Sequence, residues 1–184
     1  MGASKPEEYG DYFAWGEVDT KERYEWETYK WRGTSSFTLT KYCPTDKTSY
    51  WAGEGSPDGK TVLEPEDDAA HVMLGGKWRM PTYKEYVELK NNCTWTWTTQ
   101  NGVRGKLATG KNDNSIFLPA AGYREGDQII TNYDGGEAMG AYWEATLDTY
   151  ASPDCAFSMY LGNDSLIGRS TGRCWGLTIR PVSE

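Results

Sequence analysis

The stretch WRMPTYKEYVELKNNCTWTWTTQNG (residues 78–102) decides the fold class, because its pattern changes from helix to strand. Thr82 and Glu85 form the T-x-x-E capping box that begins a helix. Residues 95–99 then alternate with the period of two that is typical of a strand. Asn101 and Gly102 form the dipeptide most typical of a two-residue hairpin turn. The stretch therefore predicts a short helix followed directly by antiparallel β structure.

A second short helix is predicted just before this stretch. Pro65 opens it, and residues 66–68 place negative charge in its first turn, where the helix dipole favours it. Apolar residues recur at helical spacing over 69–73, where Val72 and Met73 are expected on one face with Ala69. Gly75 ends the helix.

The rest of the chain is predicted as strands and loops. Residues 18–59 form a long irregular stretch that is rich in Thr, Tyr, Trp, Lys and Gly. Two early helices followed by a run of antiparallel strands predict the α+β class, with two short helices packed on small sheets and long irregular loops. The chain has no internal repeat or linker, so residues 1–184 are predicted to form a single domain. The further strand candidates are 10–15, 115–118, 141–147, 156–161 and 175–182.

Composition limits the partners. The chain of 184 residues has a formal net charge of −8 and is long enough to bury a sizeable core. Phosphate binding needs a basic footprint, which argues against nucleic acid as the main partner. No apolar run approaches the roughly 18 residues that a membrane helix needs. We therefore expect neither nucleic-acid binding nor membrane insertion.

The four cysteines, Cys43, Cys93, Cys155 and Cys174, are dispersed along the chain. No two have the C-x-x-C spacing of a zinc site. Four cysteines in a chain of this length do not make a disulfide scaffold. We expect one disulfide bond or none.

The segment ATLDTYASPDCAFSMYLGNDSLIGRSTGRC (145–174) has an unusual composition. It holds no Lys, Glu, Gln or Trp, and Met159 is its only methionine. At the frequency of these five residue types in the whole chain, such a segment should hold roughly seven. Two segments that look strongly specified flank it, AYW at 141–143 and WGLTIRPV at 175–182. A firm frame around an unusual insert indicates a surface whose identity matters more than its packing.

Several blocks in order along the chain resemble one known family. They are GDYFAWGE (10–17), LEPEDDAAHV (63–72), WRMPTYKEYVEL (78–89), IFLPAAGYR (116–124), AYW (141–143) and WGLTIRPV (175–182). Together they resemble the C-type-lectin-fold domains common in gut Bacteroidetes and their phages, and most of all the variable proteins of diversity-generating retroelements. Formylglycine-generating enzymes share that fold. The resemblance covers nearly the whole chain and implies a C-type lectin fold.

The resemblance also implies an origin for the unusual segment. In such systems a reverse transcriptase miscopies adenines of a template, so that AAC or AAT codons become any codon ending in a pyrimidine. Such codons never encode Lys, Glu, Gln, Met or Trp, which are the five residues depleted from 145–174. The alternative explanation is that strands and loops are in general poor in Lys and Glu.

The resemblance implies a variable region at about 141–177 and an exposed surface there that binds a protein or glycan on a cell surface. Phe157 and Ile167 are expected as apolar anchors, and Arg169 and Arg173 as donors of charge-assisted hydrogen bonds. A rigid frame keeps the ordering cost of binding low. The alternative is an ordinary polar loop between two strands. The residues expected on this variable face are Asp148, Tyr150, Ser152, Asp154, Cys155, Phe157, Ser165, Ile167, Arg169, Ser170, Thr171 and Cys174.

Two alternative functions belong to the same fold. One is a fixed carbohydrate-binding or scaffold domain, in which Trp95 and Trp97 stack on sugars, although such residues more often pack a core. The other is a formylglycine-generating-type oxidase, which needs a pair of reactive cysteines near the C-terminal end of the fold. Only Cys174 lies there, and Cys155 is nineteen positions earlier. We therefore expect a binding protein and no enzyme.

Other chemical motifs are weak. The segments KNDNS (111–115) and NYDGGE (132–137) hold oxygen ligands that suit calcium, but neither has EF-hand spacing. The E-P-N and W-N-D motifs of sugar-binding C-type lectins are absent from the sequence. His71 has no motif partner and is expected to be structural. We expect no catalytic residue, metal or cofactor, with calcium as the alternative.

The resemblance implies a location at a bacterial cell surface or on a phage virion. The first residues contain no apolar signal core, so a signal or anchor is expected upstream of them. A diversified surface predicts no single ligand, and the sequence predicts no particular oligomeric state.

Overall fold

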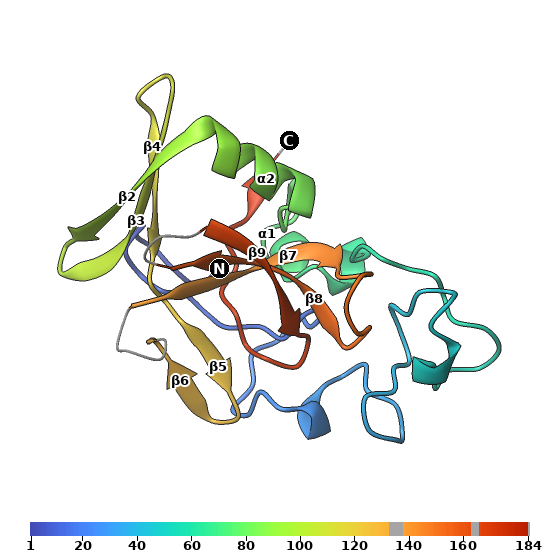
Figure 1. The fold of residues 1–184 in the computed structure, drawn as a ribbon. Helices are drawn as coiled ribbons and strands as arrows, with labels where there is room; N and C mark the ends of the chain where they lie inside the picture. The colour runs from blue at the N-terminus through green and yellow to red at the C-terminus, as the bar shows by residue number, and fades with distance from the viewer. Residues whose placement is uncertain (133–137, 163–165, 184) are drawn as a thin grey trace.

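The computed structural model describes residues 1–132, 138–162 and 166–183 (Figure 1). They form a mixed α+β domain with few helices and several small sheets. The helical elements are the 3₁₀ turns η1 (Trp26–Thr28), η2 (Thr48–Tyr50) and η3 (Pro65–Asp67), and the α-helices α1 (Ala69–Leu74) and α2 (Tyr83–Asn92). The strands are β1 (Trp78–Arg79), β2 (Cys93–Gln100), β3 (Val103–Gly110), β4 (Ser115–Pro119), β5 (Tyr123–Glu125), β6 (Gln128–Ile130), β7 (Gly140–Leu147), β8 (Cys155–Leu161), β9 (Leu166–Gly172) and β10 (Val182–Ser183).

The strands pair in small antiparallel sheets. Within the described ranges their orders are β1-β10, β2-β3-β4, β5-β6 and β7-β8-β9. Helix α2 contacts β7, β8 and β9 and runs directly into β2, so the β2-β3-β4 sheet projects from one side of the molecule (Figure 1). The arrangement confirms the predicted α+β class.

The helix and hairpin predicted for 78–102 are confirmed. The Thr82 side chain accepts a hydrogen bond from the Glu85 backbone N–H, and the Glu85 carboxylate accepts one from the Thr82 N–H at 2.8 Å. Arg79 hydrogen-bonds the same carboxylate and, with Thr82, lowers the pKa of Glu85 to about 2. Asn101 and Gly102 both have positive φ, which is the geometry that a type I′ hairpin turn requires.

The first predicted helix begins later than expected. Pro65 starts the 3₁₀ turn η3, and α1 begins after Asp68, whose carboxylate accepts from the backbone N–H groups of Ala70 and His71. The helix predicted from the spacing of Ala69, Val72 and Met73 is present, but the side chains of Val72 and Met73 are about half exposed. Only the first turn of this six-residue helix reaches the core.

Two of the predicted strands, 10–15 and 175–182, are not continuous strands. They are extended segments that meet at isolated bridges, with Phe13 N–H donating to Leu177 O at 2.9 Å and the reverse bond at 3.0 Å. Thr178 in turn bridges to Tyr142 of β7. Conversely, β9 forms where a polar loop was the alternative interpretation, because it pairs along its whole length with β8.

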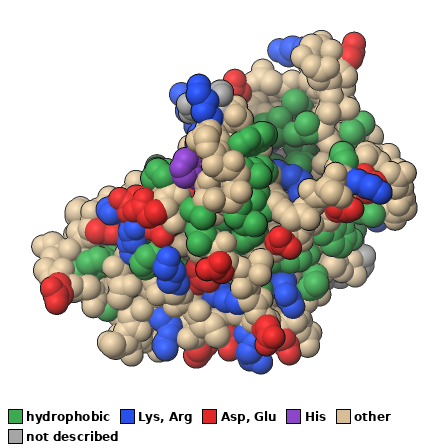
Figure 2. All heavy atoms as spheres, turned by 180° about the vertical axis from the view of Figure 1, so that it is seen from behind, with side chains coloured by type: hydrophobic (Ala, Val, Ile, Leu, Met, Phe, Trp, Pro, Cys, Tyr) green, Lys and Arg blue, Asp and Glu red, His purple; other side chains and the backbone are tan. Residues whose placement is uncertain are grey.

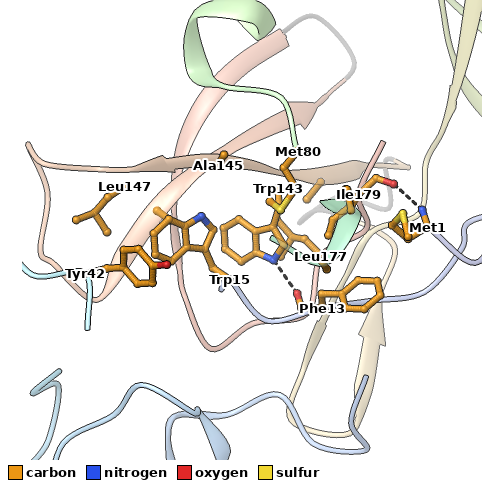
Figure 3. Packing of buried hydrophobic residues seen from close by; sticks show 14 residues of the cluster. Met1, Phe13, Trp15, Tyr42, Met80, Trp143, Ala145, Leu147, Leu177 and Ile179 are labelled. Carbon is orange, nitrogen blue, oxygen red and sulfur yellow. Dashed lines mark hydrogen bonds between the residues drawn. The ribbon is translucent and has the colours of Figure 1, made fainter. Parts of the chain in front are cut away.

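The main core joins the beginning and the end of the chain (Figure 3). Trp15 and Trp143 are fully buried at its centre, beside the ring of Tyr42. The Trp143 indole N–H donates to Phe13 O at 2.7 Å, and the Trp15 indole N–H donates to Glu144 O at 2.8 Å. Each buried indole therefore has the polar partner that it needs.

One buried side chain holds the long irregular segment predicted for 18–59. Arg173 is fully buried, and its guanidinium donates to the Tyr29 hydroxyl at 2.9 Å and to three backbone carbonyls, of Lys41, Tyr42 and Pro153, at 2.9–3.1 Å. It also lies 4.7 Å from the Trp15 ring centroid. The prediction that Arg173 contacts a ligand is wrong, because all of these contacts are internal.

The four cysteines form no disulfide bond. Cys43, Cys93, Cys155 and Cys174 are all free thiols, in line with the expectation of one disulfide or none.

Within the described residues the longest helix is α2, with ten residues, and no helix there combines the length and the hydropathy that a membrane crossing requires.

Candidate functional site

The β7-β8-β9 sheet presents two faces, because successive side chains of a strand point to opposite sides. Ala156 of β8 pairs with Thr171 of β9, and Ser158 pairs with Arg169. These four side chains and Tyr160 therefore share one face. That face, together with the β5-β6 hairpin and Trp175, encloses a groove of about 380 Å³, which we call the recognition groove.

Aromatic rings form the walls of the recognition groove. Tyr123 of β5 and Trp175 stack with ring centroids 4.9 Å apart and an angle of 12° between their planes. Tyr160 lines the groove from β8. The exposed guanidinium of Arg169 lies 5.3 Å from the centroid of the Tyr160 ring. The groove thus combines flat apolar surfaces with one cation at its edge.

Backbone pairing places these walls side by side. Arg124 and Gly176 exchange both backbone hydrogen bonds, at 2.7 and 2.9 Å, which brings their neighbours Tyr123 and Trp175 together. Gly122 has φ +64°, and a Cβ there would lie 2.0 Å from the carbonyl oxygen of Ile130. Only glycine permits the turn that presents Tyr123 to the groove.

Thr171 forms the floor of the groove and not its exposed surface. Its side chain is 6 % exposed, and its hydroxyl lies 2.7 Å from the Ser158 hydroxyl. The expectation that Thr171 is exposed together with Arg169 and Ser170 is wrong, because Thr171 pairs beside Ala156 on the covered part of the sheet.

Phe157 and Ser170 lie on the opposite face of the sheet. They are cross-strand partners, and Phe157 stacks on Tyr83 of α2 with centroids 4.6 Å apart. The expectation that Phe157 clusters with Arg169 is therefore wrong, because their side chains point to opposite faces of the sheet. Ser170 is exposed on that face.

The loop between β7 and β8 is arranged around Asp148. This carboxylate is 5 % exposed and accepts from the backbone N–H groups of Tyr150 and Ala151 at 2.9 and 3.1 Å. Asp148 therefore shapes the loop, and the expectation that it lies on the binding surface is wrong. Tyr150 is 92 % exposed at the loop. Backbone carbonyls of Ser152 and Asp154 accept from Cys155 and Arg173.

Three further residues were expected on the variable face, namely Ser165, Ile167 and Cys174. Ser165 lies outside the described residues. Ile167 pairs with Tyr160 through the backbone of β9. Cys174 is buried, which contradicts its expected exposure, and it packs against the Tyr12, Tyr24 and Tyr29 cluster.

Burial dominates the environment of the Cys155 and Cys174 thiols. Burial raises the pKa of Cys174 to about 12, and burial also raises the pKa of Cys155. A nucleophilic cysteine needs the opposite shift, toward the thiolate at neutral pH.

The sequence also offered calcium ligands at 111–115 and 132–137 and the tryptophans Trp95 and Trp97. In the described parts of the chain, no group of three His, Cys, Asp or Glu side chains is close enough to hold a metal ion. Most of the calcium candidate at 132–137 lies outside the described residues. Trp97 donates to Gly162 O and lies beneath Arg104 and Lys106, while Trp95 packs against a core cluster. Trp95 therefore fits the core-packing interpretation, whereas Trp97 is partly exposed beneath two cations.

Sequence reasoning missed Tyr123, Tyr160 and Trp175 as walls of the groove. The sequence signal for Tyr160 is its spacing of two residues from Ser158, which places both side chains on one face of a strand. Tyr123 and Trp175 are far apart in the sequence and come together only in the folded chain. No family model, no curated protein and no solved structure matches this chain.

Proposed function

We propose that this domain is a ligand-recognition module with a C-type lectin fold, which binds a protein or glycan on a cell surface through the recognition groove. The observation that carries the proposal is the groove itself, with its stacked Tyr123–Trp175 wall and the Arg169 cation beside Tyr160. The few helices, small antiparallel sheets and long irregular segment fit the fold that the sequence resemblance implies.

The chemistry of the groove suits recognition of a polar, partly flat ligand. Aromatic faces supply large contact areas at low entropic cost, and guanidinium groups bind carboxylate or other oxygen acceptors with directed hydrogen bonds. Both kinds of group sit on paired strands, so little ordering is needed when a ligand arrives. We place such a module at a bacterial cell surface or on a phage virion.

The position of Met159 supports diversification of this surface by a retroelement. Met159 is the one residue of 145–174 that a pyrimidine-ending codon derived from AAC or AAT cannot encode, and it is buried. The groove residues from the same segment, Tyr160, Arg169 and Thr171, all belong to the encodable set. Residues that such codons exclude, Trp143 and Trp175, frame the segment on either side.

Binding is tested with the labelled full chain on immobilised glycans and on a panel of intact bacterial cells. Arg169→Gln should weaken binding at least about tenfold, because it removes the charge at the groove edge. Arg104→Gln is the matched control, since Arg104 is also an exposed arginine over an aromatic ring but lies on β3. Equal binding by wild type and Arg169→Gln, or binding to no cell and no glycan, would contradict the proposal.

Diversification has a separate test in the genome. A near-repeat of the coding sequence for 141–177, differing mainly at adenines and lying beside a reverse transcriptase gene, is the expected result. A neighbourhood that lacks both would remove the retroelement while leaving a fixed carbohydrate-binding domain of the same fold, for which the Tyr123–Trp175 stack is the supporting feature.

A further inference from the structure

A second hollow lies on the other side of the β7-β8-β9 sheet, beneath α2. Its volume is about 510 Å³, within the range of pockets that bind small molecules. Figure 2, which views the molecule from behind, shows hydrophobic side chains around a hollow beside the projecting sheet. The apolar lining comes from Tyr86, Leu89, Ile116, Leu118, Tyr142 and Met159. We call this hollow the α2 cavity.

The α2 cavity contains a carboxyl group that nothing in the described chain satisfies. Glu144 of β7 lines it and is 1 % exposed, and neither carboxyl oxygen has a hydrogen-bond partner among the described residues. The hydroxyl of Tyr86, which lines the same cavity, is also buried without a partner there. Buried polar groups are nearly always paired, so two orphans at one cavity point to an absent partner.

The pKa of Glu144 reflects its burial without a hydrogen-bond partner among the described residues. Burial alone raises its pKa to about 8. Burial first, and then the charge of Glu144, raises the pKa of the Tyr86 hydroxyl. Arg180 lines the cavity too, but its guanidinium donates to the backbone carbonyls of Glu8, at 2.7 Å, and Pro6. Arg180, the cation in the cavity lining, is therefore already engaged with backbone carbonyls.

We propose that the α2 cavity binds a small amine with an apolar body, whose ammonium group pairs with the Glu144 carboxylate. An ammonium has three N–H donors, which match the two carboxyl oxygens and the Tyr86 hydroxyl oxygen. The apolar body of the ligand would fill the remaining volume and remove the apolar walls from water. An anionic ligand does not fit, because Glu85 and Glu88 flank the same cavity.

The proposal predicts a pH dependence with a definite sign. Below pH 8 the empty cavity holds Glu144 protonated, so binding an ammonium must release that proton. Affinity should therefore rise by about tenfold per pH unit as the pH approaches that value. Besides Glu144, the titratable or charged groups that line the cavity are Glu85, which is paired with Arg79, and Tyr86, Glu88, Cys93, Tyr142 and Arg180.

Calorimetric titration of the full chain with phenylethylamine, and with phenylethanol as its neutral analogue, tests the proposal. The amine should bind wild type at least about tenfold more tightly near pH 8 than near pH 6, while the alcohol should show no such change. Glu144→Gln should remove both the tight binding and its pH dependence. Glu88→Gln, the same change at the exposed edge of the cavity, should remove neither.

A cavity-filling variant tests whether the ligand occupies the α2 cavity while the Glu144 carboxyl group stays in place. Leu89→Trp places a large ring in the cavity from α2 and should abolish amine binding while Glu144 remains. Circular dichroism of each variant reports whether the chain folds, and Glu144→Gln replaces a buried, protonated carboxyl group with a neutral amide of the same size and should fold normally. Equal affinity of amine and alcohol near pH 8, wild-type affinity in Glu144→Gln, or no saturable binding below about 10 mM would overturn the proposal. None of these outcomes depends on the recognition groove.

Discussion

Replacement of Arg173 by methionine tests the main structural assignment in the segment 145–174. Methionine keeps an unbranched apolar stem but is shorter than arginine and has no donor. The change leaves the carbonyl oxygens of Lys41, Tyr42 and Pro153 without their donor in the interior, and the Tyr29 hydroxyl loses one bond. The irregular segment and the β7–β8 loop would then lose their common anchor.

The magnitude follows from those contacts. Four hydrogen bonds from a charged donor contribute about 1.5–3 kcal/mol each, of which the cost of burying the guanidinium offsets several kcal/mol. The remainder is a loss of about 3–5 kcal/mol in the free energy of unfolding. For a chain of this size that loss lowers the melting temperature by about 10 °C.

Urea unfolding followed by tryptophan fluorescence measures the effect, because Trp15 lies 4.7 Å from the guanidinium. The matched control is Arg169→Met, an exposed arginine only four residues earlier, which should cost less than about 1 kcal/mol. A loss below about 1 kcal/mol for Arg173→Met would refute the anchoring role and would return Arg173 to the set of surface residues.

Three further predictions concern local structure. Asp68→Ala removes the acceptor of three backbone N–H groups, those of Ala70, His71 and Met80, and should lower the free energy of unfolding by about 2 kcal/mol in urea titration; an unchanged midpoint would contradict this role. Thr82→Ala should cost about 1 kcal/mol in the same assay, whereas Thr82→Ser should cost little, and equal costs would argue against the capping box. Because the folded-state pKa of Glu144 is raised to about 8 from the ordinary 4.5, its stabilising proton is fully bound below 4.5 and is lost as pH rises through 8. Stability should therefore fall by up to about 1.4 kcal/mol per pH unit over that interval, and melting curves of Glu144→Gln should lack this part of the slope.

The elements that could be predicted are those whose signals are local. The Thr82–Glu85 capping box and the Asn101–Gly102 turn each depend on atoms within three residues of one another, so the sequence contains the whole interaction. The segment 10–15 failed as a strand because its partner lies some 160 residues away at Leu177 and meets it at one bridge. Strand β9 has no apolar alternation, and it forms because β8 supplies a full set of backbone partners.

The candidate site was harder to predict than the fold, for a geometric reason. Composition drew attention to the segment that forms β8 and β9, yet it could not assign each residue to a face. Arg169 and Arg173 look equivalent in the sequence, and one is exposed while the other is fully buried. The stacked partner of Trp175 comes from β5, and Glu144 follows directly after the block AYW (141–143) without any motif of its own.

The alternation along β8 has a consequence for how this protein can change. Met159 faces the α2 cavity and its neighbour Tyr160 faces the recognition groove, although a single peptide bond joins them. Substitution of Tyr160 therefore changes the recognition groove and leaves the lining of the α2 cavity unchanged. Insertion or deletion of one residue in β8 would exchange the two faces and present the cavity lining to solvent. Lineages of this domain should accordingly differ by replacements within the hairpin strands, and should accept length changes only in the loops that join them.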